Sequence, residues 1–250
     1  MLMGMMIVVG FIVGFLVGCT GMGGIILIPA LVYLSGLSSH VAMGTTLFTF
    51  IFTTSLCSWL YIRLGHVDWK ATIPICIGGF LFTYVGADVK AFTAAPYLNL
   101  ILALLILLAG ALVFCPVRGR RFSFMEEGRR SRFWVLFAVG FVAGLTGAGG
   151  PVLSVPIMIA LGFPPLIAIG AGQVYSVPVA LSGSAANFLH GAIDYKVGAL
   201  MIVIQILGIL LGVYMANRMD TTKLRKMVAW VCLFCGGFIL VNAIRGILAM

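Results

Sequence analysis

The chain consists of eight long apolar blocks joined by short polar connections, and this pattern places it in a membrane. The blocks occupy residues 3–34, 41–62, 71–89, 96–114, 133–161, 166–189, 197–216 and 224–248. A helix needs about 20 apolar residues to cross the hydrocarbon core. Hydrophobic residues make up 62% of the sequence and charged residues 8%, against about 25% charged residues in soluble domains. We therefore expect an all-α polytopic membrane protein.

The last four blocks repeat the first four. When the sequence is shifted by 126 positions, residues 11–70 align without a gap with residues 137–196, and about 17 of the 60 positions are identical. The register is plainest where GHVDWK (65–70) aligns with GAIDYK (191–196). Such a duplication indicates two units built alike. We expect a first transmembrane repeat at 1–115, a basic cytoplasmic linker at 116–132 and a second transmembrane repeat at 133–250.

Each repeat begins with a glycine-rich phrase inside an unusually long block: GFLVGCTGMGG at 14–24 and GFVAGLTGAGG at 140–150. As one straight helix, either block would reach roughly 45 Å, longer than the ~30 Å hydrocarbon core. Glycine clusters interrupt helices, and so do the prolines that follow here, Pro29 in the first copy and Pro151 and Pro156 in the second. We interpret each block as a pair of half-helices.

Each pair can fold back as a re-entrant hairpin or continue as one broken crossing. With hairpins, each repeat adds three transmembrane helices, the two repeats are inverted, and about twelve of the 15 Lys and Arg residues lie on one side. With continuous crossings the repeats are parallel, and the basic residues divide about ten to five. Because basic residues collect on the cytoplasmic side, the charges favour hairpins and an inverted repeat, with the continuous crossing as the alternative.

Charge also limits the partners. The net charge of +9 comes from residues in the connections, where they act as topology signals, so we expect a lipid bilayer and no nucleic acid as partner. The first block lacks a basic leader and a cleavage pattern, and we expect it to be retained. Asp68 and Asp194, each followed by an aromatic residue and a lysine, are expected to cap the helices after them.

The sequence contains few candidates for catalytic or metal-binding residues. The six cysteines lie within apolar segments, as small buried side chains do, although Cys232 and Cys235 form a C-x-x-C. The histidines have no metal-ligand spacing, and we expect no metal and no cofactor. All six acidic residues lie at or beyond block ends, and no ATP-binding phosphate loop is present. These features favour a secondary transporter over a pump or an enzyme.

The glycine phrases are the expected binding site. Unwound backbone at mid-membrane is tolerated only where protein buries it or where it lines a polar cavity, and half-helix N-termini attract anions. We therefore expect the two phrases to face each other around an anionic substrate. The expected substrate-binding residues are Thr20, Gly21, Gly23 and Gly24 in the first phrase, Thr146, Gly147, Gly149 and Gly150 in the second, and Thr45, Thr46, Gln173, Ser184 and Asn187 in the neighbouring spans. No catalytic residue is expected.

The pattern GFLVGCTGMGGIILIPAL (14–31), followed by AMGTTL (42–47) and by the second copy GFVAGLTGAGGPVLSVP (140–156), resembles the TauE/SafE family of membrane transporters. This family is also called the sulfite exporter or toluenesulfonate uptake permease family, and the resemblance covers almost the whole chain. It implies passage of small sulfur-containing or organic anions, such as sulfite, sulfonates or sulfoacetate, across the bacterial inner membrane.

The expected function is thus a secondary transporter of such an anion. The resemblance favours export, and a monoanion leaving a negative interior gains about 2.3 kcal/mol per 100 mV. The alternatives are an intramembrane thiol-redox enzyme that uses Cys232 and Cys235, an anion channel, and a membrane scaffold. The sequence leaves the substrate, the coupling ion, the direction of net flow (export or uptake) and the oligomeric state open, with a homodimer as one option.

Overall fold

The structure is a computed structural model, and it describes residues 2–78, 80, 134–138, 151–189 and 193–248, with isolated residues and short runs between 100 and 113. The expected linker at 116–132 lies outside these residues. The described elements are α1 (Leu2–Thr20), α2 (Gly24–Ser35), α3 (Ser39–Arg63), α7 (Pro151–Ala160), α8 (Pro165–Leu189), α9 (Tyr195–Arg218) and α10 (Thr221–Leu248). The described part of the chain contains no strand, which confirms the expected all-α fold.

Three described helices are long and apolar enough to cross a membrane. They cover Val41–Arg63, Tyr195–Arg218 and Thr221–Arg245. Shorter apolar helices cover Gly4–Thr20, Pro151–Ala160 and Pro165–Leu181. Large apolar side chains remain exposed on the outer helices, for example Val203, Leu207 and Phe234. A helix that exposes such residues along its length is suited to face lipid.

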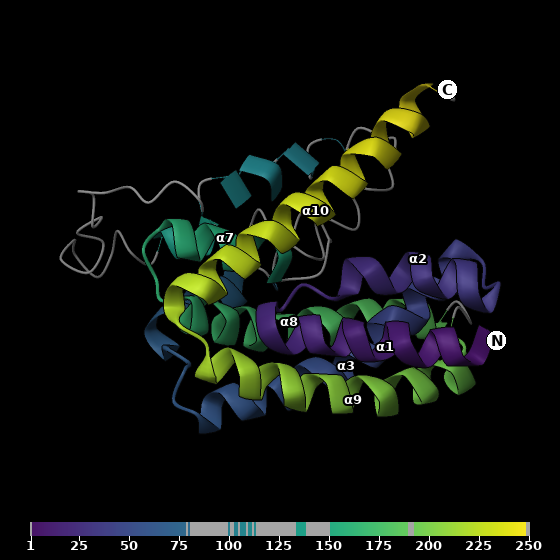
Figure 1. The fold of residues 1–250 in the computed structure, drawn as a ribbon, viewed down its shortest axis with the longest axis horizontal. Helices are drawn as coiled ribbons and strands as arrows, with labels where there is room; N and C mark the ends of the chain where they lie inside the picture. Colours follow the sequence, from purple (N-terminus) through teal and green to yellow (C-terminus); the bar gives the residue numbers. More distant parts are fainter. Residues whose placement is uncertain are drawn as a thin grey trace.

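The first apolar block is broken where the glycines predict a break. α1 ends at Thr20 and α2 begins at Gly24, and the chain reverses between them (Figure 1). At the far end of the pair, Ser35 Oγ lies 3.6 Å from Met6 Sδ, so the end of α2 lies beside the start of α1. α2 has 12 residues, about 18 Å of helix, which is too short to cross the ~30 Å core. The two half-helices form a hairpin in this structure.

Two central helices occupy equivalent positions in the sequence repeat and run in opposite directions. The bounds of α3, 39–63, become those of α8, 165–189, on adding 126. The backbone at Gly170, near the start of α8, packs against the His66 carbonyl just beyond the end of α3. Farther along, Phe50 of α3 and Ala180 of α8 line one cavity. In these contacts a lower residue number in α3 pairs with a higher one in α8, so the two helices are antiparallel neighbours.

α1 packs on α9 through glycines on both helices. A side chain at Gly14 would overlap the backbone of Gln205, and one at Gly18 would overlap the backbone at Ile209. In return, a Cβ at Gly212 would overlap the Phe15 carbonyl. In these contacts the residue numbers increase in the same direction along both helices, so α1 and α9 are parallel. Close approach through small residues is how helices associate where lipid provides no hydrophobic driving force, and Gly14 and Gly18 have this packing role here.

Both predicted aspartate caps are confirmed. Asp68 Oδ1 accepts a hydrogen bond from Lys70 N at 3.0 Å, and Asp194 Oδ1 accepts from Lys196 N, also at 3.0 Å. The two caps lie at opposite ends of α3: Asp68 follows its C-terminus, whereas Asp194 N donates to Thr45 Oγ1 near its N-terminus at 3.0 Å. Residues at equivalent places in the sequence repeat therefore lie at opposite ends of the molecule.

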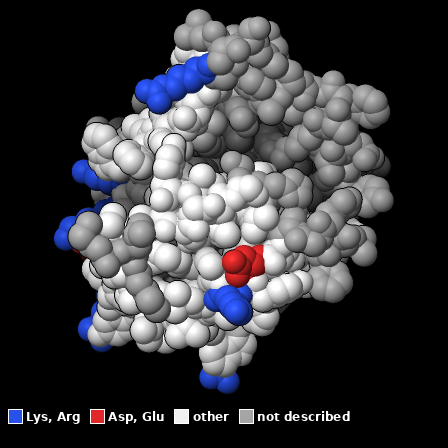
Figure 2. All heavy atoms as spheres, turned by 90° about the vertical axis from the view of Figure 1, so that its right-hand side faces the viewer, with Lys and Arg blue, Asp and Glu red and all other residues white. Residues whose placement is uncertain are grey.

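The basic side chains differ between the two ends. Arg63 and Arg218 end α3 and α9, and each lies over an aromatic ring of its own helix, Trp59 at 4.1 Å and Tyr214 at 4.4 Å. The two helix ends are joined by His66 Nε2 and Asn217 Oδ1, 2.6 Å apart, and α10 begins there with Lys223, Arg225 and Lys226. Figure 2 shows the opposite end, where the described atoms near the centre are uncharged except for one acidic group beside a basic one, and further Lys and Arg lie toward the edges of the view.

Candidate functional site

The candidate site surrounds the glycine turn, residues 21–23, between α1 and α2. Gly21 has a positive φ of 81°, a conformation that glycine adopts without the penalty of a Cβ atom. Thr20 supports the turn from inside α1: its hydroxyl donates to the Leu16 carbonyl at 2.8 Å and accepts from Met22 N at 3.3 Å. Thr20 is fully buried, so the turn lies inside the protein.

The last carbonyls of α1 obtain partners from helices distant in sequence. Gln173 Nε2 of α8 donates to Val17 O at 2.8 Å, and Tyr61 OH of α3 donates to Gly18 O at 2.8 Å. A helix C-terminus leaves its final carbonyls without intrahelical partners. These two fully buried side chains supply them, which fixes the end of α1 between α3 and α8.

The start of α2, on the other side of the turn, has no such partner. Its N-cap is Gly23, and no side chain caps it. The first N–H groups of a helix point out of its N-terminus, where they give a partial positive charge that favours anions. The described residues therefore give two carbonyls on one side of the break side-chain donors and leave the N–H groups on the other side without a capping side chain.

Each glycine of the turn is packed too closely to carry a side chain. A Cβ at Gly21 would lie 2.8 Å from Pro151 Cβ, and one at Gly23 would lie 2.5 Å from the Val13 carbonyl. A Cβ at Gly24 would overlap the ring of Phe50. Pro151 directly follows the second glycine phrase, so the structure places the start of α7 against the first phrase.

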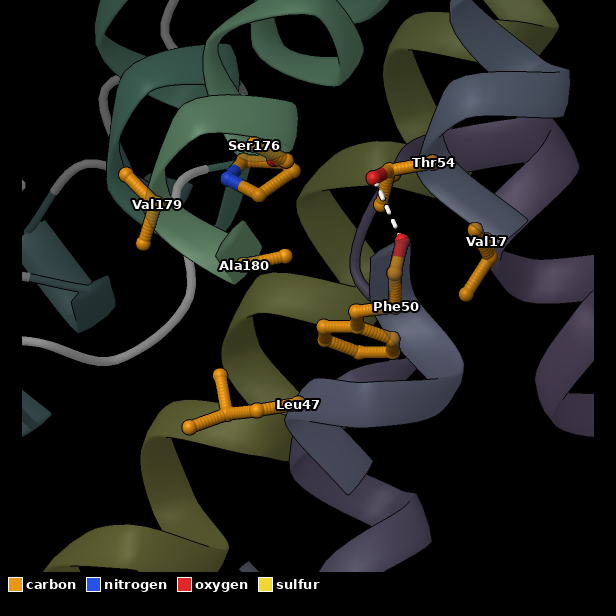
Figure 3. Close-up of a pocket in the computed structure, with 9 residues that line it drawn as sticks. Val17, Leu47, Phe50, Thr54, Ser176, Val179 and Ala180 are labelled. Atoms are coloured by element: carbon orange, nitrogen blue, oxygen red, sulfur yellow. Dashed lines mark hydrogen bonds between the residues drawn. The ribbon is translucent and has the colours of Figure 1, made fainter. Parts of the chain in front are cut away.

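A small cavity, called the central cavity here, lies beside this turn. Its lining residues are Val17, Gly21, Leu47, Phe50, Thr54, Pro151, Ser176, Val179 and Ala180. In Figure 3 the α3 side chains Leu47, Phe50 and Thr54 lie opposite Ser176, Val179 and Ala180 of α8. The cavity volume is about 10 Å³, which corresponds to roughly one water-sized probe. The site is closed in this structure.

Two hydroxyls line the central cavity, and both donate to their own helix. Thr54 Oγ1 donates to Phe50 O at 2.6 Å (Figure 3), and Ser176 Oγ donates to Gly172 O at 2.7 Å. With its proton used in this way, each oxygen presents only lone pairs to other groups. Neither residue was among the expected binding residues.

The structure separates the expected residues into groups. Thr20, Gly21, Gly23, Gly24 and Gln173 meet at the turn. Thr45 and Thr46 lie outside the central cavity: Thr45 accepts from Asp194 N, and Thr46 donates to Ala42 O at 2.8 Å. Ser184 is buried and its hydroxyl has no partner among the described residues. Thr146, Gly147, Gly149 and Gly150 lie outside the described residues, as does the side chain of Asn187.

Two further buried polar residues were missed. Ser58 Oγ and both amide atoms of Gln205 are buried without a hydrogen-bond partner among the described residues. Ser58 aligns with Ser184 in the sequence repeat, so equivalent hydroxyls are unpaired in the two halves. Gln205 carries the signal that singled out Gln173, an amide within an apolar span, and the same reasoning would have found it.

The cysteine pair is poorly placed for redox chemistry. Cys232 and Cys235 are free thiols in α10, 0% and 1% exposed, and Cys232 Sγ lies 3.5 Å from Met22 Sδ. Among the described residues, no group of three His, Cys, Asp or Glu side chains could hold a metal ion. These thiols pack as small apolar groups.

A larger cavity, of about 340 Å³, lies between α1, α2 and α10. Its lining includes Val9, Ile26, Ala30, Phe234 and Phe238. The lining residues carry no charge, and their polar groups are the Tyr33 hydroxyl and the Cys235 thiol, so size alone does not make this cavity the candidate site.

Comparison with known proteins identifies the family of this chain. The family model for the sulfite exporter TauE/SafE matches residues 6–239. The chain belongs to the TauE/SafE family. The match covers both glycine phrases, and membership confirms that this is a membrane protein of a transporter family.

Similar proteins come from bacteria and an archaeon. The probable membrane transporter protein YunE of Bacillus subtilis is 24% identical over 92% of this chain and 94% of its own length. A probable membrane transporter protein of Xylella fastidiosa is 29% identical over 86% of this chain and 85% of its own. Another, of Methanocaldococcus jannaschii, is 26% identical over 96% of each. No solved structure matches the chain.

Proposed function

We propose that this TauE/SafE protein is a secondary transporter that exports a small sulfur-containing or organic anion, such as sulfite, a sulfonate or sulfoacetate, across the bacterial inner membrane. The observation that carries the proposal is the asymmetry of the glycine turn. Two carbonyls at the end of α1 accept hydrogen bonds from Gln173 and Tyr61, whereas the N-terminus of α2 has no capping side chain. An anion is the ligand that such an end attracts.

Two observations support an inverted repeat, on which the proposed transport mechanism depends. α3 and α8 share the 126-residue offset and are antiparallel, and the equivalent caps Asp68 and Asp194 lie at opposite ends of α3. In inverted-repeat transporters the broken helices meet near the bilayer midplane, and the two halves move against each other to expose the site alternately. The contact between Gly21 and Pro151 is where the two halves would meet.

The closed central cavity fits one state of such a cycle. Its volume of about 10 Å³ is too small for a sulfur oxyanion, so substrate entry requires displacement of Phe50 or Pro151 from the turn. The polar groups that lack partners, Gln173 Oε1 and Ser58 Oγ, would gain them from substrate or water in the open states. Buried groups without partners are rare in folded proteins and call for such an explanation.

The driving force for export does not require an acidic side chain of the protein. The acidic residues of the described spans, Asp68, Asp194 and Asp220, all lie just before helix starts. The membrane potential alone contributes about 2.3 kcal/mol per 100 mV for each negative charge that leaves the cell.

The first test is the thermal stability of the detergent-purified protein with sulfite, sulfate, thiosulfate, taurine, sulfoacetate and matched carboxylates. A ligand at 100 times its Kd stabilises by about 2.7 kcal/mol. Stabilisation by a sulfur oxyanion or sulfonate that is reduced in Gly24→Ala, but kept in Gly237→Ala, supports the proposed site. Gly237 is the matched control because a Cβ there meets no atom within 4 Å. No shift with any anion would contradict the proposal.

Flux in proteoliposomes separates the transporter from an anion channel. In a carrier, the flux saturates with substrate concentration and labelled substrate shows counterflow. In a channel, the flux does not saturate. The redox alternative makes a different prediction, labelling of Cys232 or Cys235 by an impermeant maleimide in the folded protein, and their burial predicts that both stay unlabelled.

A further inference from the structure

The amide of Gln173 has a fixed orientation beside the glycine turn. Its Nε2 donates to Val17 O at 2.8 Å. The same nitrogen is close to the turn, because a Cβ atom added at Gly21 would lie 3.4 Å from it. A carbonyl can only accept, so the nitrogen must face Val17 and the oxygen cannot exchange places with it. Because both atoms belong to one planar amide, Oε1 also lies beside the turn.

Gln173 Oε1 is a buried acceptor without a donor. The residue is 0% exposed, and no hydrogen-bond partner reaches this oxygen from the part of the chain that the structure describes. Gln173 lies one helical turn before Ser176, which lines the central cavity. The free oxygen therefore lies next to Gly21 and Ser176, two residues that line the cavity where the substrate is proposed to bind.

The other side-chain groups at this cavity are acceptors too. The hydroxyl protons of Thr54 and Ser176 are donated to backbone carbonyls, which leaves only oxygen lone pairs. Donors at the site come from the backbone at the start of α2, where Gly23 is the N-cap and no side chain caps the helix. Among the described residues, no Lys, Arg or His lines the central cavity, so these residues offer a dianion partial charges and no full positive charge.

On the proposed transport function, we propose that the site selects a monoanion that itself carries an O–H or N–H donor, and that Gln173 Oε1 accepts from this donor. Hydrogen sulfite and hydroxyalkyl sulfonates belong to this class. The anionic oxygens face the N-terminus of α2, and the donor faces Gln173. Sulfate, thiosulfate and fully deprotonated sulfite lack the donor and add a second charge that the site does not balance.

A matched ligand pair tests the inference directly. Ethanesulfonate and 2-hydroxyethanesulfonate have the same charge and nearly the same size, and only the second carries a donor. We expect the purified protein to bind 2-hydroxyethanesulfonate about tenfold more tightly by titration calorimetry, the scale of one buried acceptor gaining its partner. Gln173→Met should bring the affinities for the two sulfonates to within about threefold of each other, because the acceptor for the hydroxyl group is gone.

Gln205→Met is the matched control. Gln205 is also a buried glutamine whose amide has no described partner, but it lies in α9 against Gly14 of α1, away from the central cavity. This variant should fold and keep the tenfold preference, which separates a ligand contact from a general effect of losing a buried amide.

Sulfite gives a second measurement that uses no variant. Its apparent affinity should fall as rising pH converts hydrogen sulfite into the dianion, while the affinity for ethanesulfonate stays constant. Equal binding of both sulfonates by the unmodified protein, or an unchanged preference in Gln173→Met, would overturn the inference and leave anion transport standing. Failure of every anion to bind would instead contradict the proposed transport function.

Discussion

At the scale of single residues, the glycine turn combines two kinds of constraint. Gly21 is required by its positive φ, whereas Gly24 is required by a neighbour, the ring of Phe50 that packs on its backbone. Phe50 aligns with Ser176 in the sequence repeat, so the two halves differ at this position. The Phe50 ring covers the start of α2. The equivalent position in α8 is Ser176, so α8 has no aromatic ring there.

The contact between Gly24 and Phe50 predicts a non-additive pair of substitutions. Gly24→Ala should lower stability by about 1–3 kcal/mol, because the added Cβ overlaps the ring. In a Phe50→Leu background the same change should cost at least 1 kcal/mol less, a coupling typical of residues in contact. Apparent Tm values of the four detergent-purified proteins measure this, and strictly additive values would contradict the contact.

The aspartate caps predict a different pattern. Asp68→Ala and Asp194→Ala should each cost about 1 kcal/mol, because a helix N-cap loses its acceptor, whereas Asp→Asn at either position should cost much less, since asparagine caps as well. Apparent Tm again provides the measurement. If Asn were as harmful as Ala at either position, the negative charge and not the hydrogen bond to Lys70 N or Lys196 N would be the important property.

At the scale of elements, α1 is held by neighbours from both halves of the sequence. α9 packs along it through Gly14, Gly18 and Gly212, while Tyr61 of α3 and Gln173 of α8 bond its last carbonyls. Cys19 Sγ adds a hydrogen bond to Gly212 O at 3.0 Å. The helix that leads into the glycine turn is therefore the most constrained part of the proposed site, and α2 is better suited to move.

This packing predicts that the α1–α9 contact does not tolerate larger side chains in place of its glycines. Gly14→Val should prevent recovery of monodisperse protein or lower its apparent Tm strongly, because its side chain overlaps the Gln205 backbone and backbone cannot yield as a flexible side chain does. Gly237→Val in α10, where no atom lies within 4 Å of an added Cβ, is the matched control. Equal tolerance of both changes in size-exclusion and Tm measurements would contradict the parallel contact.

At the scale of the whole molecule, the two halves place equivalent residues at opposite ends. Lys70 and Lys196 are equivalent in the repeat, both are exposed, and each follows one of the aspartate caps. α3 separates them: the distance from Thr45 to Arg63 along this helix is about 27 Å at 1.5 Å per residue. An inverted repeat across the bilayer would therefore place Lys70 on the cytoplasmic side with Arg63 and Arg218, and Lys196 on the other.

Accessibility of introduced cysteines tests this topology. In cells, an impermeant thiol reagent should label Lys196→Cys and not Lys70→Cys, and in inverted membrane vesicles the two should exchange roles. The native cysteines that the structure describes are buried or partly buried, and the unmodified protein measures their background. Labelling of both positions from the same side would contradict inversion and favour parallel repeats with a continuous first crossing.

The sequence by itself determined the features that depend on neighbouring residues. Long apolar blocks predicted membrane helices, the glycine cluster predicted the break between Thr20 and Gly24, and Asp68 and Asp194 predicted their caps, because backbone freedom, apolar length and capping act over a few residues. The offset of 126 predicted the matching bounds of α3 and α8 as well.

Only the tertiary structure decided which distant groups meet. Gln173 bonds Val17, 156 residues away, Phe50 covers Gly24, and Thr54 and Ser176 line the central cavity although Thr45 and Thr46 do not. The spans are apolar on nearly every face, so periodicity does not identify the buried face of a helix as it does in a soluble protein. The rotation and register of each helix come instead from close packing of small residues and a few buried hydrogen bonds, which exist only once the helices are together.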